Sequence, residues 1–258
     1  MWWRRWSAPA VTVIGAIVLW EAVVGGFRLP EYLLPAPSGV LAALAAEWRY
    51  LGLHTAVTVY EILWGFLLSI LIGVPLAMII VYSPLLERAF YPLLVASQSV
   101  PKIAIGPLLI FWAGLGMFPK ILVAFLLAFF PIVIDTVVGL RSVEPEMLHL
   151  ARSMGAPERR IFLKIRLPNA FPNIFAGLKV AVTLAVVGAI VGEFIQADRG
   201  LGYALLQANA MLNTRLSFAA ILILAAIGVV LFAIVDVIER FLIPWHASHR
   251  TEMAAGTL

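Results

Sequence analysis

The chain has 258 residues, of which 63% are hydrophobic and 12% are charged, and its net charge is +4. Soluble domains carry about a quarter charged residues, so this composition excludes an ordinary soluble protein and predicts an integral membrane protein built from helices. With no cysteine, the chain cannot form a disulfide, a thiolate metal site or a cysteine nucleophile. Its basic residues lie beside apolar segments, which gives no support to a nucleic-acid partner.

Six apolar stretches are long enough to be interpreted as membrane spans, which need about 20 residues each. The first stretch follows two arginines, but it is longer than the roughly 7–15 residues of a signal-peptide core, so it predicts a retained helix. No repeat or linker divides the stretches, and residues 1–258 are therefore expected to form a single membrane domain. The expected spans are residues 9–27, 55–81, 93–113, 120–140, 171–195 and 216–243.

Basic residues between the spans predict the orientation of the chain, because cytoplasmic loops are enriched in lysine and arginine. If the N-terminus is cytoplasmic, five basic residues fall outside, namely Arg28, Arg49, Lys120, Arg199 and Arg215. Eleven then fall inside, namely Arg4, Arg5, Arg88, Arg141, Arg152, Arg159, Arg160, Lys164, Arg166, Arg240 and Arg250. This asymmetry predicts that both termini and the polar segment 141–170 are cytoplasmic.

The segment 141–170 is a polar, basic island between two apolar helices, and its prolines and glycine predict two short helices. Pro145 suits a first helical turn, Gly155 suits the left-handed position that ends a helix, and Pro157 can open the next one. The expected helices are 145–154 and 157–166, with a stop at Leu167–Pro168. The second helix is expected to place Ile161, Phe162 and Ile165 on one face and Arg159, Arg160 and Lys164 elsewhere.

Taken alone, this pattern leaves two interpretations open for the island. It could be a basic interfacial helix that rests on anionic lipid, or it could hold a soluble partner.

The spacing within the island resembles a known motif. Ala151, Gly155, Ile165 and Leu167–Pro168 are similar in identity and spacing to the EAA loop of ABC importer permeases, Glu-Ala-Ala-x3-Gly-x9-Ile-x-Leu-Pro. The chain departs from the motif at His149 and Leu150, where the family usually has Glu and often has Ala.

The resemblance extends from about Leu34 to Trp245. Within this family the chain is similar to the nitrate/sulfonate/taurine-type branch, which also includes permeases for pyrimidine vitamin precursors, riboflavin and bicarbonate. The segments that carry this likeness are residues 97–104, 107–108, 129–131 and 200–203.

The resemblance implies a type I ABC importer permease with six transmembrane helices in a bacterial inner membrane. Such a subunit forms the pathway for a small solute that an extracytoplasmic binding protein delivers. It couples to a cytoplasmic ATPase dimer, and two permease copies, most simply a homodimer, meet the two ATPase subunits. ATP and Mg then belong to the ATPase, and no cofactor is expected on this chain. The sequence does not identify the solute.

The resemblance also implies which residues of the island couple to the ATPase. Gly155 would supply the bend and the small Ala151 a close approach to the partner, while Arg152, Arg159 and Arg160 either pair with acidic groups there or only reflect the positive-inside bias. The expected coupling residues are His149, Ala151, Arg152, Gly155, Ala156, Arg159, Ile165, Leu167 and Pro168.

Polar residues inside the spans are candidates for the translocation pathway, because intramembrane charges usually face protein or water. Lys102 follows Pro101, where a local break is expected, and could attract an anion or instead pair with Asp135 or Glu193. The pathway candidates are Ser97, Gln98, Ser99, Lys102 and Glu193, whereas Glu21, Glu61, Asp236 and Glu239 are expected to be interfacial or paired. Gly188 and Gly192 have GxxxG spacing, which fits a contact within the chain or between two copies.

The alternatives to an importer permease are an intramembrane enzyme and an ATPase-independent secondary transporter. The sequence has no phosphate loop, no His-Glu-x2-His pair and no Gly-x-Ser-x-Gly elbow, and its four histidines do not cluster inside spans. A secondary transporter would usually carry paired repeats of broken helices, and the six stretches contain no such pair. Neither a catalytic nor a metal site is therefore predicted.

Overall fold

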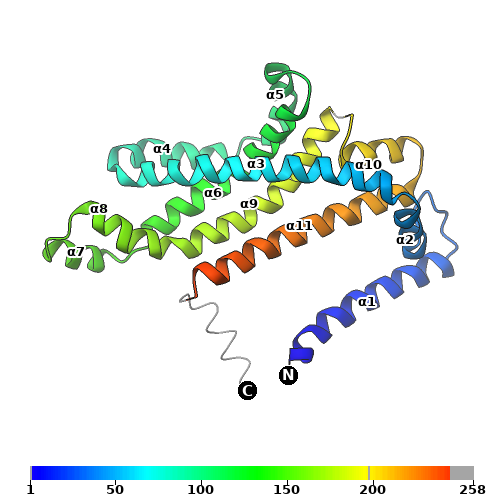
Figure 1. Ribbon diagram of the computed structural model, residues 1–258, viewed down its shortest axis with the longest axis horizontal. Coiled ribbons are helices and arrows are strands. Elements are labelled where there is room, and N and C mark those ends of the chain that lie inside the picture. Colours follow the sequence, from blue (N-terminus) through cyan, green and yellow to red (C-terminus); the bar gives the residue numbers. More distant parts are fainter. Residues whose placement is uncertain (1, 197, 245–258) are drawn as a thin grey trace. The chain divides into compact units, whose positions relative to one another are not determined.

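The computed structural model describes the backbone of residues 2–196 and 198–244, and the side chains of that part of the chain from Val11 onward (Figure 1). These residues are almost entirely helical, which confirms the predicted all-α membrane fold. The elements are α1 (Trp2–Gly26), α2 (Pro37–Ala46), α3 (Trp48–Tyr82), α4 (Pro84–Ser97), η1 (Lys102–Ile105), α5 (Gly106–Ala113), α6 (Met117–Arg141), α7 (Pro145–Ser153), α8 (Glu158–Ile161), η2 (Phe162–Arg166), α9 (Leu167–Ile195), α10 (Leu201–Ala210) and α11 (Thr214–Leu242).

Four continuous helices are long and apolar enough to cross a membrane, and they correspond to four of the six expected spans. They are Trp48–Tyr82, Met117–Arg141, Glu158–Ile195 and Thr214–Leu242. The described apolar part of α1, Val11–Gly26, is shorter than these helices, so the first expected span stays a prediction.

The third expected span, 93–113, is broken at Pro101, where the sequence predicts a local break. The chain runs as α4 and then η1 with α5, and the two parts are bent by 89°; Figure 1 shows the corner. Pro101 lies at the break, where it lacks a backbone N–H and disfavours helical geometry at Val100. Counted as one broken span, the pair brings the number of candidate spans to five.

The chain divides into two compact units, and the first combines residues 1–58 with residues 197–226. Within it, the N-terminus of α10 is capped by two side chains of α3. The Gly200 N–H donates to His54 Nδ1 at 2.9 Å, and the Leu201 N–H donates to Thr58 Oγ1 at 2.8 Å. The Glu21 carboxylate accepts hydrogen bonds from the Ser38 hydroxyl and N–H at 2.6 and 3.0 Å, which ties α1 to the start of α2.

The second unit combines residues 59–196 with residues 227–258, and its core is the close packing of α6 on α9 (Figure 1). Glycine makes this approach possible. A Cβ at Gly188 would lie 2.6 Å from the Ala124 Cα, and one at Gly192 would lie 3.0 Å from the Lys120 Cα. The GxxxG pair therefore makes a contact within the chain, which the sequence had left undecided between an internal and a dimer contact.

The predicted helix stop at Leu167–Pro168 is also wrong, because α8, η2 and α9 form one helical run from Glu158 to Ile195. Pro168 has no N–H to donate to the preceding turn. The chain absorbs this loss in the π-helical turn η2, where the Leu167 N–H donates to the Phe162 carbonyl oxygen, five residues back. A wider turn of this kind lets the helix continue past a proline that would otherwise end it.

Candidate coupling site and translocation pathway

The bend between α7 and α8 has the hydrogen bonds of a Schellman motif. The Ala156 N–H donates to the Ala151 carbonyl oxygen at 3.1 Å, and the Gly155 N–H donates to the Arg152 carbonyl oxygen at 2.9 Å. Gly155 itself has φ of +76°, a left-handed conformation that glycine adopts without strain. The first short helix and its glycine end therefore lie where the sequence predicted them.

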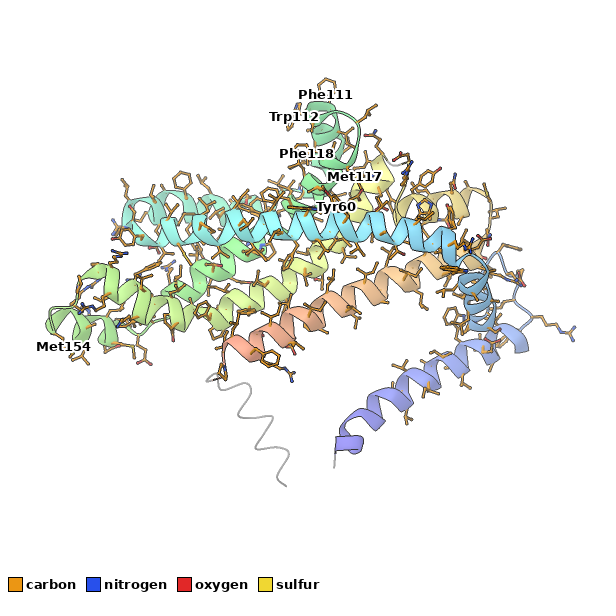
Figure 2. The ribbon with its side chains drawn as sticks, in the orientation of Figure 1. Tyr60, Phe111, Trp112, Met117, Phe118 and Met154 are labelled. Carbon is orange, nitrogen blue, oxygen red and sulfur yellow. The ribbon has the colours of Figure 1, made fainter. Side chains whose placement is uncertain are left out.

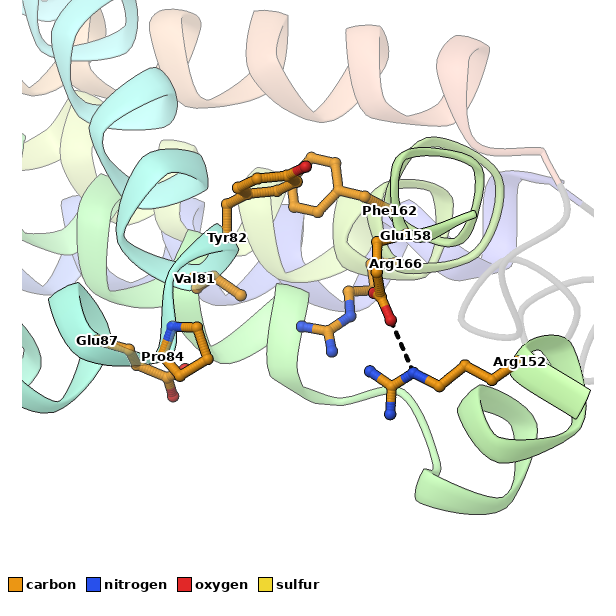
Figure 3. A pocket seen from close by; sticks show the side chains of 8 residues that line it. All are labelled: Val81, Tyr82, Pro84, Glu87, Arg152, Glu158, Phe162 and Arg166. Atoms are coloured by element: carbon orange, nitrogen blue, oxygen red, sulfur yellow. Dashed lines mark hydrogen bonds and ion pairs between the residues drawn. The ribbon is translucent and has the colours of Figure 1, made fainter. Parts of the chain in front are cut away.

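An ion pair between two side chains also spans this bend. Arg152 Nε lies 2.7 Å from Glu158 Oε1, so an ion pair joins the end of α7 to the start of α8 (Figure 3). Pro157 precedes α8 with φ of −67° and ψ of 146°, which its ring favours. Two backbone hydrogen bonds, one ion pair and one proline thus fix the angle between the two helices.

Helix α7 has no buried residue and exposes an apolar stripe. Met147, Leu150 and the C-cap residue Met154 are 51, 63 and 78% exposed, and their i, i+3, i+7 spacing places them on one face. Figure 2 labels Met154 at this end of the chain's second unit. An exposed apolar stripe on a short helix is typical of a partner contact. The sequence analysis missed these three residues, although their spacing was the signal that could have identified them.

The other predicted coupling residues fall into two groups. His149 and Arg159 are exposed, and neither forms an ion pair within the described residues. Ile165, Leu167 and Pro168 are half-buried, and Leu167 packs against the core of the second unit. The second group therefore anchors the island on the bundle, while His149 and Arg159 remain accessible to a partner.

The expected two faces of the second short helix are present. Ile161 is 1% exposed, Phe162 packs against the core, and Ile165 is half-buried. The basic residues Arg159, Arg160 and Lys164 are exposed.

Four pathway candidates lie together at the break between α4 and α5. Ser97 ends α4, with its hydroxyl donating to the Leu94 carbonyl oxygen at 2.6 Å, and Gln98 and Ser99 are exposed in the turn that follows. Lys102 Nζ lies 4.7 Å from the centre of the Phe130 ring and 3.4 Å from the Gln98 carbonyl oxygen. The expected alternative, an ion pair of Lys102 with Asp135 or Glu193, is not formed within the described residues.

Glu193, the fifth candidate, belongs to a different cluster. Its neighbour Glu61 pairs with Lys120, whose Nζ lies 2.8 Å from Glu61 Oε1, and both side chains are nearly inaccessible, at 0 and 3% exposure. Glu193 is 1% exposed and within hydrogen-bonding reach of Glu61. The sequence places Lys120 at the outer end of the span 120–140, and the structure shows that α6 buries its side chain in the core.

Lys179 forms a second ion-pair cluster, which involves Asp236 and Glu239 of the last expected span. It pairs with Asp236 and Glu239 of α11 at 2.5 and 2.6 Å. Both acidic residues are therefore paired, as the sequence analysis expected.

Comparisons with known proteins identify the family of the chain. The family model described as "Binding-protein-dependent transport system inner membrane component" matches residues 65–244, which is more than half of the chain. The formylaminopyrimidine transport permease protein of Halalkalibacterium halodurans is 36% identical over 92% of this chain and 95% of its own length.

Two further relatives cover similar shares. The riboflavin transport system permease protein of Chloroflexus aurantiacus is 36% identical over 95% of this chain and 94% of its own length. The taurine transport system permease protein of Escherichia coli is 28% identical over 94% of this chain and 91% of its own length.

Proposed function

Because the chain belongs to the family of binding-protein-dependent transport system inner membrane components, we propose that α7 is the element through which it couples to an ATPase. The chain is the membrane-spanning translocation subunit of an ABC importer for a small solute, and it is a transporter subunit rather than an enzyme. It falls within the sulfonate/taurine-type branch.

The observation that carries the proposal is the exposed stripe of α7 beside a bend of fixed geometry. Met147, Leu150 and Met154 form an apolar surface that a groove on the ATPase can cover, while His149 and Arg159 can pair with acidic groups at its rim. The Arg152–Glu158 pair keeps the helix angle constant, so that movement of the ATPase is passed to α8 and α9. ATP and Mg bind to the ATPase in this scheme.

The break between α4 and α5 supports a role for Ser97, Gln98, Ser99 and Lys102 in the translocation pathway. Uncharged polar groups bind and release a solute readily, and a lysine without a carboxylate partner within the described residues adds attraction for negative charge. Glu193 is proposed to act on the same pathway without contacting the solute, because it is buried beside Glu61 and Lys120.

ATP-dependent uptake tests this function directly. Proteoliposomes that contain this chain and its ATPase are expected to take up the molecule that co-purifies with the binding protein, and only when ATP and binding protein are both present. The measurement is uptake with and without the ATPase. Equal uptake by the chain alone would support the secondary-transporter alternative instead.

The orientation proposed here places both termini and segment 141–170 in the cytoplasm of a bacterial inner membrane. Single cysteines at Ser153 and Ser38, both exposed positions, are expected to react with a membrane-impermeant maleimide from opposite sides, Ser153→Cys from the cytoplasm. The chain has no cysteine of its own, so no background labelling arises. Reaction of both from one side would contradict the topology.

Two copies of this chain are proposed for each complex. One chain carries one α7, and an ATPase dimer offers two grooves. The tip of α5 also exposes Phe111 and Trp112, at 83 and 69%, which a second copy can cover (Figure 2). Mass measurement of the solubilised complex is expected to give two identical permease subunits, and a single permease subunit per ATPase dimer would contradict the proposal.

A further inference from the structure

A cavity of about 380 Å³ lies between the corner that joins α3 to α4 and the bend that joins α7 to α8. Its volume falls in the range of about 300–1,000 Å³ that is common for small-molecule sites. Every residue around it belongs to the second compact unit. The cavity is lined by Val81, Tyr82, Pro84, Glu87, Arg152, Glu158, Phe162 and Arg166 (Figure 3).

The cavity is lined by two acidic and two basic residues, and both acidic residues already have an arginine partner. Glu87 is paired with Arg141 at 2.9 Å, and Glu158 is paired with Arg152 at 2.7 Å. Arg166 is half-buried in the π-helical turn and extends into the cavity, and no carboxylate of the described residues lies within ion-pair distance of it (Figure 3). The cavity is therefore suited to an anion rather than to a neutral or cationic ligand.

A second cavity, of about 290 Å³, shares two aromatic residues with the first. Tyr82 and Phe162 pack edge to face with ring centres 5.9 Å apart, and both line the two cavities. The second cavity is otherwise lined by Met78, Ile79, Ser83 and Leu86. The cavity that holds Arg166 thus adjoins an apolar groove, with an aromatic pair between them.

We propose that these two cavities bind one anionic phospholipid of the cytoplasmic leaflet. Its phosphate lies against the Arg166 guanidinium, whose planar donors match phosphate geometry, and one acyl chain lies along Met78 and Leu86. Basic pockets on the cytoplasmic side of helical bundles hold lipid headgroups in this way. The inference rests on the proposed orientation of segment 141–170, and its readout is lipid retention rather than transport.

The site lies between the corner of α3 and α4 and the bend behind α7. Val81 and Pro84 belong to the corner of α3 and α4, whereas Arg152 and Glu158 span the bend behind α7. A lipid phosphate between them bridges this corner to the bend. Bound lipid is therefore expected to stabilise the bend without touching the exposed stripe of α7.

Native mass spectrometry of the permease–ATPase complex, purified in detergent and titrated with phosphatidylglycerol, tests the proposal. Arg166→Gln is expected to lower retained phosphatidylglycerol about tenfold, because a charge-assisted hydrogen bond is lost. Lys164→Gln is the matched control, since Lys164 is exposed in the same turn and lies outside both cavities, and it should retain lipid as the parent does. Leu86→Trp is expected to lower retention by filling the apolar groove while Arg166 remains.

Three ligands separate the possible sources of the anion. Phosphatidylglycerol should bind, phosphatidylcholine should bind much more weakly, and glycerol 1-phosphate should fail to displace the lipid at equal concentration. Full displacement by glycerol 1-phosphate would identify a free-phosphate site and overturn the lipid assignment. Equal loss of lipid in Arg166→Gln and Lys164→Gln would show a general surface-charge effect and overturn the site. Unchanged retention in both Arg166→Gln and Leu86→Trp would also overturn it.

Discussion

Replacement of Gly155 by valine is expected to abolish substrate uptake while the chain still inserts and folds. No atom lies within 4 Å of a Cβ placed at Gly155, so a side chain meets no steric obstacle there. The cost comes from the backbone alone, since φ of +76° costs an ordinary residue about 1–2 kcal/mol and a β-branched residue more. Relaxation out of this conformation breaks the Ala156–Ala151 hydrogen bond and swings α7 away from its partner.

The matched control is Gly155→Asn, because asparagine tolerates the left-handed conformation better than other non-glycine residues. Uptake and co-purification of the ATPase should fall strongly in Gly155→Val and be largely retained in Gly155→Asn. Ala151→Arg, which adds bulk beside the stripe, should resemble the valine variant. Parental uptake and ATPase binding in Gly155→Val would show that the loop does not couple the two subunits, and the lipid-surface interpretation of the island would then be favoured.

Replacement of Lys120 by methionine is expected to destabilise the folded chain by about 3–5 kcal/mol, the usual consequence of removing one partner of a buried ion pair. Lys120 is 2% exposed, and its ammonium lies beside Glu61, which is itself beside Glu193. Methionine fills a similar volume but leaves two acidic side chains in the core without the lysine. The Tm of the solubilised protein and its monodisperse yield should both drop.

Two companion variants make this result specific. Lys120→Met combined with Glu61→Gln should recover part of the lost stability, because an amide does not need a cation. Lys164→Met, at an exposed position outside the core, should leave the Tm unchanged. If Lys120→Met alone melts at the parental temperature, the buried pair does not contribute to stability.

Much of the coupling site could be predicted from the sequence because its signals are local. A glycine two residues before a proline indicates a helix end and a new start, and Gly155 and Pro157 occupy those positions. The apolar face of Ile161 and Phe162 followed from helical periodicity for the same reason.

The errors arose where distant segments or compensating geometry decide the outcome. Lys120 begins an expected span, but its partner Glu61 lies on another helix, and no local pattern reveals that pairing. Pro168 is a strong stop signal, but a π-helical turn accommodates it. At Pro101 the sequence predicts a break, and the structure adds its angle of 89°.

The continuous helical run from Glu158 to Ile195 connects the bend behind α7 directly to the core of the second unit. Its 38 residues span roughly 57 Å at a rise of about 1.5 Å per residue. One end begins at the bend behind α7, and the other carries Glu193 into the core beside Glu61. A displacement at the first end reaches the second without crossing a loop, and η2 and Pro172 are points where this helix can bend. In the proposed coupling, movement of the ATPase therefore reaches the buried Glu61, Lys120 and Glu193 through this one helix.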